Sequence, residues 1–135
     1  MEVLGTLKFS TNFQFRCLGD VAGLDFILSG FRLAVSYNLL SVRFNKRLRL
    51  LVFLETLGFL PSVVSLFESG CWLEREVWDL LGVFFSNSPD LRRLLTDYGF
   101  EGHPLRKDFP LEGFLGISYS CLKEIILIMK AYAGS

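Results

Sequence analysis

Three side chains between residues 76 and 103 are of types that could carry acid–base chemistry. Glu76 and Asp79 are three positions apart, a spacing that places two carboxylates on one face of a helix. His103 is the only histidine of the chain, and an imidazole ring can exchange a proton near neutral pH. One hypothesis is therefore a small acid/base enzyme that uses Glu76, Asp79 and His103.

The same residues also have a structural interpretation. Arg75 precedes Asp79 by four positions, which permits an ion pair along a helix, and Glu74 and Glu76 stand where a helix N-terminus favours acids. His103 has no second histidine or cysteine-rich partner with which to complete a metal site. The sequence also lacks a Gly-x-Ser-x-Gly elbow and a glycine-rich phosphate-binding turn. The motif search therefore finds no enzyme active site, no metal-ligand set and no phosphate-binding or dinucleotide-binding pattern.

Charge is concentrated in residues 74–113. This stretch holds 13 of the 28 acidic and basic residues, mixes both signs and includes Pro104 and Pro110, which stiffen its backbone. Arginine and aromatic side chains are enriched at interface centres, and a stiff loop loses less entropy when it docks. The pattern favours a protein-binding subunit. The candidate interface or structural residues are Glu74, Arg75, Glu76, Asp79, Arg92, Arg93, Asp97, Tyr98, His103, Arg106, Lys107, Asp108 and Phe109.

Upstream of this stretch, three apolar runs are rich in β-branched or aromatic residues and predict strands. The runs are 32–37, 40–44 and 47–54, and the polar pair Asn45-Lys46 stands at hairpin length between the second and the third. Neighbouring strands joined by so short a connection pair antiparallel. The sequence therefore predicts an antiparallel sheet with one solvent-facing side.

Helix signals follow the sheet. A short helix is expected over 63–67, and a second from about residue 72 to 81, where apolar residues recur at helical spacing and Gly82 is placed to end the helix. The sequence Ser-Pro-Asp at 88–90 has the form of a helix start, which predicts a third short helix over 91–95. The two prolines make 102–110 a charged loop.

The ends of the chain are less patterned. Residues 2–10 are expected to add a strand or a docking segment, and 13–30 show no clear period and stay unassigned. After residue 114 an apolar segment fits either a helix or a strand, since pattern alone does not separate the two. We predict a single α+β domain over 1–135, mainly an antiparallel sheet packed with helices, followed by an extended charged loop and, from about 111 to 135, an extended or docking tail.

Composition narrows the classes of function. At 135 residues, one core is expected, and 51% hydrophobic residues exceed what a small monomer usually hides, so a self-assembling scaffold is a further alternative. Fourteen acids balance fourteen bases, which disfavours a nucleic-acid partner. Three scattered cysteines predict neither a disulfide framework nor a metal cluster. The longest uncharged stretch, 56–67, is too short for a membrane span, and the N-terminus has no features of an import leader.

A resemblance adds to this reading. Glu-Arg-Glu-Val-Trp-Asp at 74–79, ending in Gly82, and the long run from Asp90 through Tyr-Gly-Phe-Glu-Gly-His-Pro-Leu-Arg-Lys-Asp-Phe-Pro-Leu to 111 closely resemble the 30-kDa subunit family (subunit 9) of respiratory complex I. Residues 32–47 also look like the sheet of this family. Where the family usually has His-Pro-Asp, this chain has Ser-Pro-Asp at 88–90, and an apolar segment replaces the family's polar tail.

The resemblance implies an α+β core subunit of the peripheral arm of NADH:ubiquinone oxidoreductase, without catalytic residues of its own. Its main partner would be the quinone-module subunit that resembles a hydrogenase large subunit. NADH, FMN, iron–sulfur clusters and ubiquinone would be bound by neighbouring subunits. The expected location is the matrix side of the mitochondrial inner membrane, peripheral to it, with the bacterial cytoplasmic face as the alternative; no nucleic acid and no direct membrane span are expected.

Overall fold

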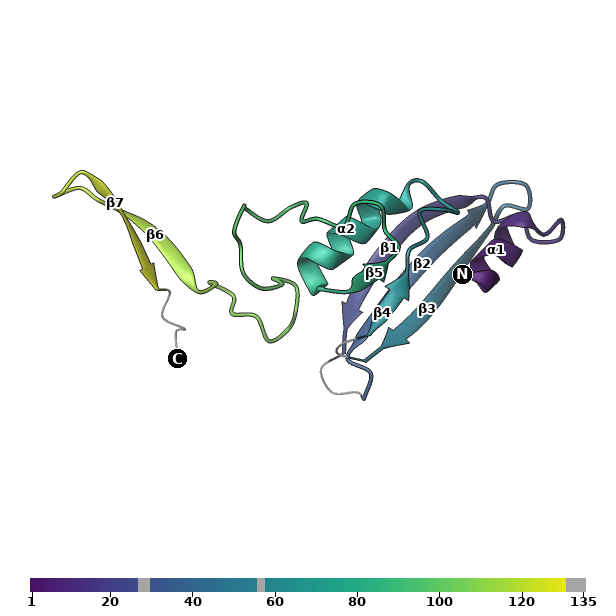
Figure 1. Ribbon diagram of the computed structural model, residues 1–135, viewed down its shortest axis with the longest axis horizontal. Coiled ribbons are helices and arrows are strands. Elements are labelled where there is room, and N and C mark those ends of the chain that lie inside the picture. Colours follow the sequence, from purple (N-terminus) through teal and green to yellow (C-terminus); the bar gives the residue numbers. More distant parts are fainter. Residues whose placement is uncertain (27–29, 56–57, 131–135) are drawn as a thin grey trace.

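The computed structural model describes residues 1–26, 30–55 and 58–130, and its elements run along the chain as a helix, a sheet, a short β-α-β unit and a final hairpin (Figure 1). The helices are α1 (Glu2–Phe9) and α2 (Gly70–Leu81). The strands are β1 (Cys17–Asp25), β2 (Leu33–Ser41), β3 (Lys46–Leu54), β4 (Phe59–Pro61), β5 (Phe84–Ser86), β6 (Leu115–Ser120) and β7 (Ile125–Lys130). The predicted α+β class, mainly an antiparallel sheet with helices, is confirmed.

The main sheet has the order β1-β2-β3, and both pairings are antiparallel. Alternate side chains of the central strand, among them Val35, Tyr37 and Leu39, are buried in the core. Helix α2 lies over this face, chiefly against β1, and contributes Val77 and Leu81 to the same core (Figure 1). The opposite side of the sheet, on which Arg47, Arg49, Leu51 and Phe53 of β3 are exposed, is called the open face. It is the solvent-facing side that the sequence predicted.

Two predicted strands prove to be one. The runs 32–37 and 40–44 are joined in β2, which ends at Ser41, and Asn38 does not break the strand because it lies on the open face and accepts a hydrogen bond from Arg49 Nε at 3.1 Å. The run 47–54 is confirmed as β3. The predicted hairpin is also confirmed, although its turn spans 42–45, with Asn45 at φ 48°.

The third strand of the sheet comes from the region without a clear period. Strand β1 contains two glycines and a register shift between Leu18 and Asp20, which together disrupt the two-residue alternation. Gly23 is required by packing, since a Cβ atom there would lie 2.1 Å from Leu81 Cδ1. The alternating pattern that would have predicted β1 is therefore interrupted at Gly23, where α2 packs closely on the sheet.

Three further predictions of local structure are corrected. For residues 2–10 a strand or a docking segment was predicted, and the strand is wrong: residues 2–9 form helix α1, in which Leu4 and Leu7 recur at helical spacing and pack against the core. Residues 63–67 form a single turn, with Phe67 N–H donating to Val63 O at 2.8 Å. No helix forms over 91–95. The helix predicted from 72 to 81 is confirmed as α2, and Gly82, at φ 75°, ends it.

The last described element is an isolated hairpin. Strands β6 and β7 pair antiparallel from Leu115↔Lys130 to Ser120↔Ile125, and they lie apart from the rest of the fold (Figure 1). One side presents Leu115, Ile117 and Tyr119 with Ile126 and Ile128, all exposed. The tail, left open between helix and strand, is thus a strand pair up to residue 130. Among the described residues, no helix is long and apolar enough to cross a membrane.

The close approach at Gly23 makes a testable prediction. Gly23→Val should lower the free energy of unfolding by about 1–3 kcal/mol, because the new side chain must displace Leu81 and Val77 from a packed core. Chemical denaturation measures the change. Gly5→Ala is the control, since a Cβ there meets nothing within 4 Å and α1 should gain about 0.5–1 kcal/mol. Equal stability of Gly23→Val and the parent chain would contradict the packing described.

Candidate functional site

The polar residues of α2 bind irregular backbone on both sides of the helix. Glu74 is fully buried and accepts hydrogen bonds from the Ser62 hydroxyl at 2.8 Å and the Val63 N–H at 2.6 Å. Burial raises the pKa of Glu74, although these two hydrogen bonds oppose the rise. Burial, together with the charge of Glu74, also raises the pKa of Tyr37. Glu74 therefore fixes the chain between β4 and α2.

Asp79 is the most heavily bonded side chain of the helix. It is fully buried, and its Oδ2 accepts the N–H groups of Leu94, Leu95 and Thr96 at 3.2, 2.7 and 2.9 Å. Its Oδ1 accepts the Thr96 hydroxyl at 2.6 Å and Arg93 Nη1 at 3.1 Å. Burial alone would raise the pKa of Asp79, but the hydrogen bonds, led by those of Thr96, lower it to about 2. These contacts also explain the missing helix over 91–95. The amides of 94–96 would have to donate to the carbonyls of residues 90–92 in such a helix, and they are bound to Asp79 instead.

Two arginines complete this anchorage. Arg75 donates from Nε to Arg92 O and from Nη2 to Arg93 O, both at 3.3 Å, and its guanidinium lies 4.9 Å from the centroid of the Trp72 ring. Arg93 also donates to Gly102 O at 3.0 Å. The predicted Arg75–Asp79 ion pair is wrong, since the ion-pair partner of Asp79 is Arg93 and Arg75 bonds to backbone carbonyls instead.

The C-terminus of α2 is capped by residues 103–106. Three successive carbonyls, those of residues 79, 80 and 81, accept His103 Nδ1 at 3.0 Å, Leu105 N–H at 3.0 Å and Arg106 Nε at 2.7 Å. A helix end leaves such carbonyls without internal partners, and a cation near them is favourable. Because a carbonyl only accepts, His103 Nδ1 carries a hydrogen. Burial, followed by the charges of Arg106 and Arg93, lowers the pKa of His103.

The loop beyond the cap returns to the edge of the sheet. Lys107 N–H donates to Asp25 Oδ2 at 2.9 Å, and Arg32 forms ion pairs with Asp25 at 3.4 Å and Asp108 at 2.7 Å. The hydrogen bond to Arg32 lowers the pKa of Asp108. Phe109 packs against Phe100 and Phe114, with ring centroids 5.9 and 5.3 Å away. The predicted charged loop over 102–110 is thus held at both ends.

This geometry does not form an acid/base site. The Glu76 side chain lies on the exposed surface of α2, whereas the Asp79 carboxylate is buried and occupied by five donors. His103 contacts the backbone carbonyl of Asp79 and not its carboxylate. Within residues 1–26, 30–55 and 58–130, no group of three or more metal-ligating side chains comes together.

Comparison with known proteins agrees with the resemblance carried by residues 74–111. A sequence model of one family, respiratory-chain NADH dehydrogenase, 30 Kd subunit, matches residues 1–115. This chain belongs to that family. The 30-kDa family match includes α1, the main sheet, α2 and the anchored loop, and it ends where the β6–β7 hairpin begins.

Individual relatives support the assignment to the 30-kDa family. The chain is 56% identical over 119 residues to NADH-ubiquinone oxidoreductase subunit 9 of Reclinomonas americana, covering 88% of this chain and 58% of that protein. It is 53% identical over 118 residues to NADH dehydrogenase [ubiquinone] iron-sulfur protein 3 of Beta trigyna, covering 87% and 62%. The chain thus spans about three-fifths of the length of these relatives.

A solved structure matches the fold. It is described as "Nqo5 of the trypsin-resistant fragment (1-134) in P63 form", with a TM-score of 0.54 and 32% identity over 67% of this chain and 74% of that one. Neither the acid/base enzyme nor the self-assembling scaffold is supported by these comparisons.

The thirteen candidate interface or structural residues divide into two groups. Seven make the inward contacts described above: Glu74, Arg75, Asp79, Arg93, His103, Arg106 and Phe109. The other six are exposed: Glu76, Arg92, Asp97, Tyr98, Lys107 and Asp108. Sequence reasoning did not name four exposed apolar residues of the same region as interface candidates. They are Trp72, Leu95, Leu105 and Leu111. The assignment of these residues to a partner interface stays a prediction.

The low pKa of Asp79 predicts how stability depends on pH. Its folded-state pKa is about 2, below the value of about 3.9 expected when unfolded, so its contribution is complete above about pH 4 and falls away as pH drops toward 2. The contribution is about 2 kcal/mol. Asp79→Asn should lower the free energy of unfolding by about 3 kcal/mol at neutral pH and flatten its slope between pH 2 and 4.

Denaturant titration at a series of pH values measures both effects. Asp97→Asn is the matched control, because it changes an exposed carboxylate of the same loop and should alter stability by less than about 0.5 kcal/mol. An Asp79→Asn protein with the parent stability and pH slope would show that Asp79 does not anchor the loop.

The helix cap gives a second prediction. Gly82→Ala should cost about 1–2 kcal/mol from its left-handed backbone, and more because a Cβ would lie 2.6 Å from Arg106 Nη2 and from the His103 ring. Gly99→Ala is the control, since it has φ 74° but meets nothing within 4 Å. The difference in unfolding free energy between the two variants isolates the packing of the cap, and no difference would argue against it.

Proposed function

We propose that this chain is a non-catalytic core subunit of the peripheral arm of NADH:ubiquinone oxidoreductase and holds the quinone module together by protein–protein contacts. The observation that carries the proposal is how the polar residues between 74 and 106 are used. Glu74 and Asp79 accept backbone amides, and three arginines donate to backbone carbonyls, so these side chains fix the shape of an irregular surface. Because these polar side chains are engaged within the chain, exposed apolar side chains are left to contact a partner subunit.

The partner in this proposal is the subunit that resembles a hydrogenase large subunit, and family membership supports it. Tyr98 is fully exposed, with Leu95, Leu105 and Leu111 between 60% and 103% exposed on the same loop. Aromatic and apolar side chains on a rigid support are the usual centres of an interface. The charged rim would come from Glu76, Arg92, Asp97 and Lys107.

The rest of the proposal follows from membership in the assembly. NADH, FMN, iron–sulfur clusters and ubiquinone belong to neighbouring subunits, and this chain binds none of them. Its place is peripheral, on the matrix side of the mitochondrial inner membrane, and the eukaryotic sources of the relatives named above support the organelle over the bacterial cytoplasmic face.

The decisive experiment follows the chain into the complex. Respiratory membranes of the source organism are solubilised gently, the complexes are separated on a native gel stained for NADH oxidation, and this chain is identified by mass spectrometry. We expect it in the active band. Recovery only in a free or unrelated band would overturn the proposed function.

A variant tests the interface itself. Tyr98→Ala should weaken association with the complex by about tenfold or more, because a central aromatic anchor contributes about 1–2 kcal/mol or more. Its own fold should keep the parent melting temperature, since Tyr98 is fully exposed. Tyr119→Ala is the matched control, because Tyr119 is exposed on β6, outside the family match, and incorporation should be unchanged. Equal incorporation of the two variants would show that Tyr98 is not part of the interface.

A further inference from the structure

The open face of the sheet carries two kinds of side chain in sequence along one strand. Arg47, Arg49, Leu51 and Phe53 alternate along β3, so all four project to the same side at steps of about 7 Å. All four are exposed, with Leu51 at 48% and Phe53 at 54%. Two cations are therefore followed by two apolar groups in a straight row.

The cationic end of this face has few acids to neutralise it. Residues 14–20 and 38–49, which form this end of the sheet and the loops beside it, contain five exposed cations against one acid, Asp20. Arg47 and Arg49 lie on the open face, Arg16 and Arg43 lie in the loops, and Lys46 lies on the other side of β3. None of the five has an ion pair within the part of the chain that the structure describes. The local charge is thus positive in a chain whose total charge is zero.

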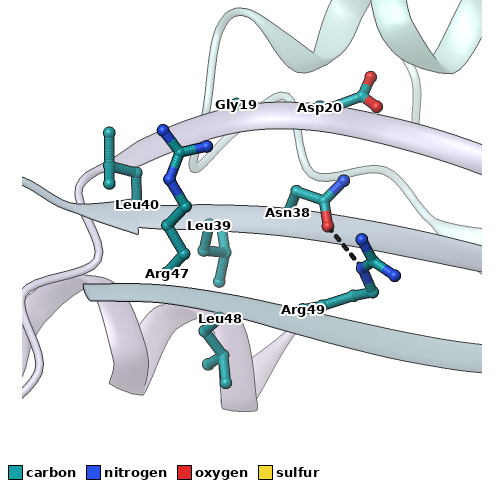
Figure 2. Close-up of a pocket in the computed structure, with 8 residues that line it drawn as sticks. All are labelled: Gly19, Asp20, Asn38, Leu39, Leu40, Arg47, Leu48 and Arg49. Atoms are coloured by element: carbon teal, nitrogen blue, oxygen red, sulfur yellow. Dashed lines mark hydrogen bonds between the residues drawn. The ribbon is translucent and has the colours of Figure 1, made fainter.

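Arg49 is already oriented for a ligand. Its Nε donates to Asn38 Oδ1 at 3.1 Å, which fixes the plane of the guanidinium, and the terminal nitrogens have no hydrogen-bond partner among the described residues. A planar fork held in this way can bind a carboxylate with little further loss of entropy. Figure 2 shows Arg47, Arg49, Asn38 and Asp20 on the same side of the sheet, with Leu39 and Leu48 on the other.

The surface around these side chains is hollowed. One open hollow is lined by residues of all three strands, among them Asp20, Asn38, Arg47 and Arg49 (Figure 2). A second hollow adjoins the end of the sheet and is lined by Gln14, Arg16, Cys17, Val42 and Arg43. The cations therefore line concave surface, which gives a bound chain more contact than a flat surface would.

The other end of the open face is apolar. The rings of Phe26 and Phe53 lie 6.3 Å apart, and Leu24 and Leu51 are also exposed there. The central strand contributes only the small residues Ala34 and Ser36 between them, and both are buried beneath the larger side chains. Exposed large apolar side chains gathered at one end of a sheet are a feature of interaction surfaces.

We propose that the open face binds an extended acidic polypeptide segment, whose carboxylates pair with Arg47 and Arg49 and whose following apolar side chains lie on Leu51 and Phe53. The 7 Å steps of the row match the spacing of alternate side chains in an extended chain. A nucleic acid fits less well, since Asp20 stands among the arginines and half of the face offers no partner to phosphate. The surface is separate from the Tyr98 loop, because α2 and that loop pack on the opposite side of the sheet.

The test is fluorescence anisotropy with the full chain and a labelled synthetic peptide. In the peptide, glutamates alternate with serines in the first half, and leucine and phenylalanine alternate with serines in the second. We expect saturable binding that weakens as salt is raised, and at least about tenfold weaker binding by Arg49→Glu and by Phe53→Ser. The same peptide with lysines in place of glutamates should not bind.

Lys123→Glu is the matched control, since it makes the same charge change at an exposed site in the β6–β7 turn and should bind the acidic peptide like the parent. Arg47→Glu provides a second variant if Arg49→Glu fails to fold, which circular dichroism would report. Absence of peptide binding, or equal weakening by Lys123→Glu, would overturn the proposal. Tighter binding to single-stranded RNA or to phosphatidylserine vesicles, lost in Arg49→Glu, would also overturn it and assign the face to that ligand.

Discussion

A fully buried carboxylate must replace its lost water with hydrogen-bond donors, and in this chain Asp79 finds them in backbone without secondary structure. Three successive amides, one hydroxyl and one guanidinium converge on its two oxygens. Glu74 does the same for the turn before α2, with Ser62 and Val63 as donors. Because the energy of an unpaired buried charge is so unfavourable, the position of the loop depends on these bonds.

This constraint explains why a domain rich in hydrophobic residues concentrates its charged residues in 74–113. Residues 87–114 form no helix or strand, so their peptide groups need partners from elsewhere. Helix α2 supplies them along its whole length: Arg75 donates to two carbonyls, Asp79 accepts three amides, and the free carbonyls at the helix end accept three donors. Half of the charged residues that sequence alone assigned to an interface or structural role are internal support for the surface that carries Tyr98. They are Glu74, Arg75, Asp79, Arg93 and Arg106.

The sequence predicted what is regular and local. Strand β3, helix α2 and its end at Gly82 all follow from periodicity and one glycine, and each is present. Prediction from the sequence failed where a contact with a distant residue overrides the local pattern. Ser-Pro-Asp at 88–90 is typical of a helix start, yet no helix follows because the amides of 94–96 donate to Asp79. Strand β1 was not recognised because it contains Gly23, which the close packing of α2 requires. For the same reason the sequence could not predict that Arg93 and Arg106 point inward, because residue spacing does not reveal their hydrogen bonds to Gly102 O and Leu81 O.

The dependence of the loop on α2 has a consequence for how the protein folds and opens. The bonds of Asp79 join residues 14–17 positions apart, and those of the cap join residues 24 or 25 apart, so each needs α2 and the loop in place at once. We therefore expect residues 88–106 to open together when the end of α2 unfolds, and not residue by residue. On that expectation, the surface that carries Tyr98 is present only while α2 is folded.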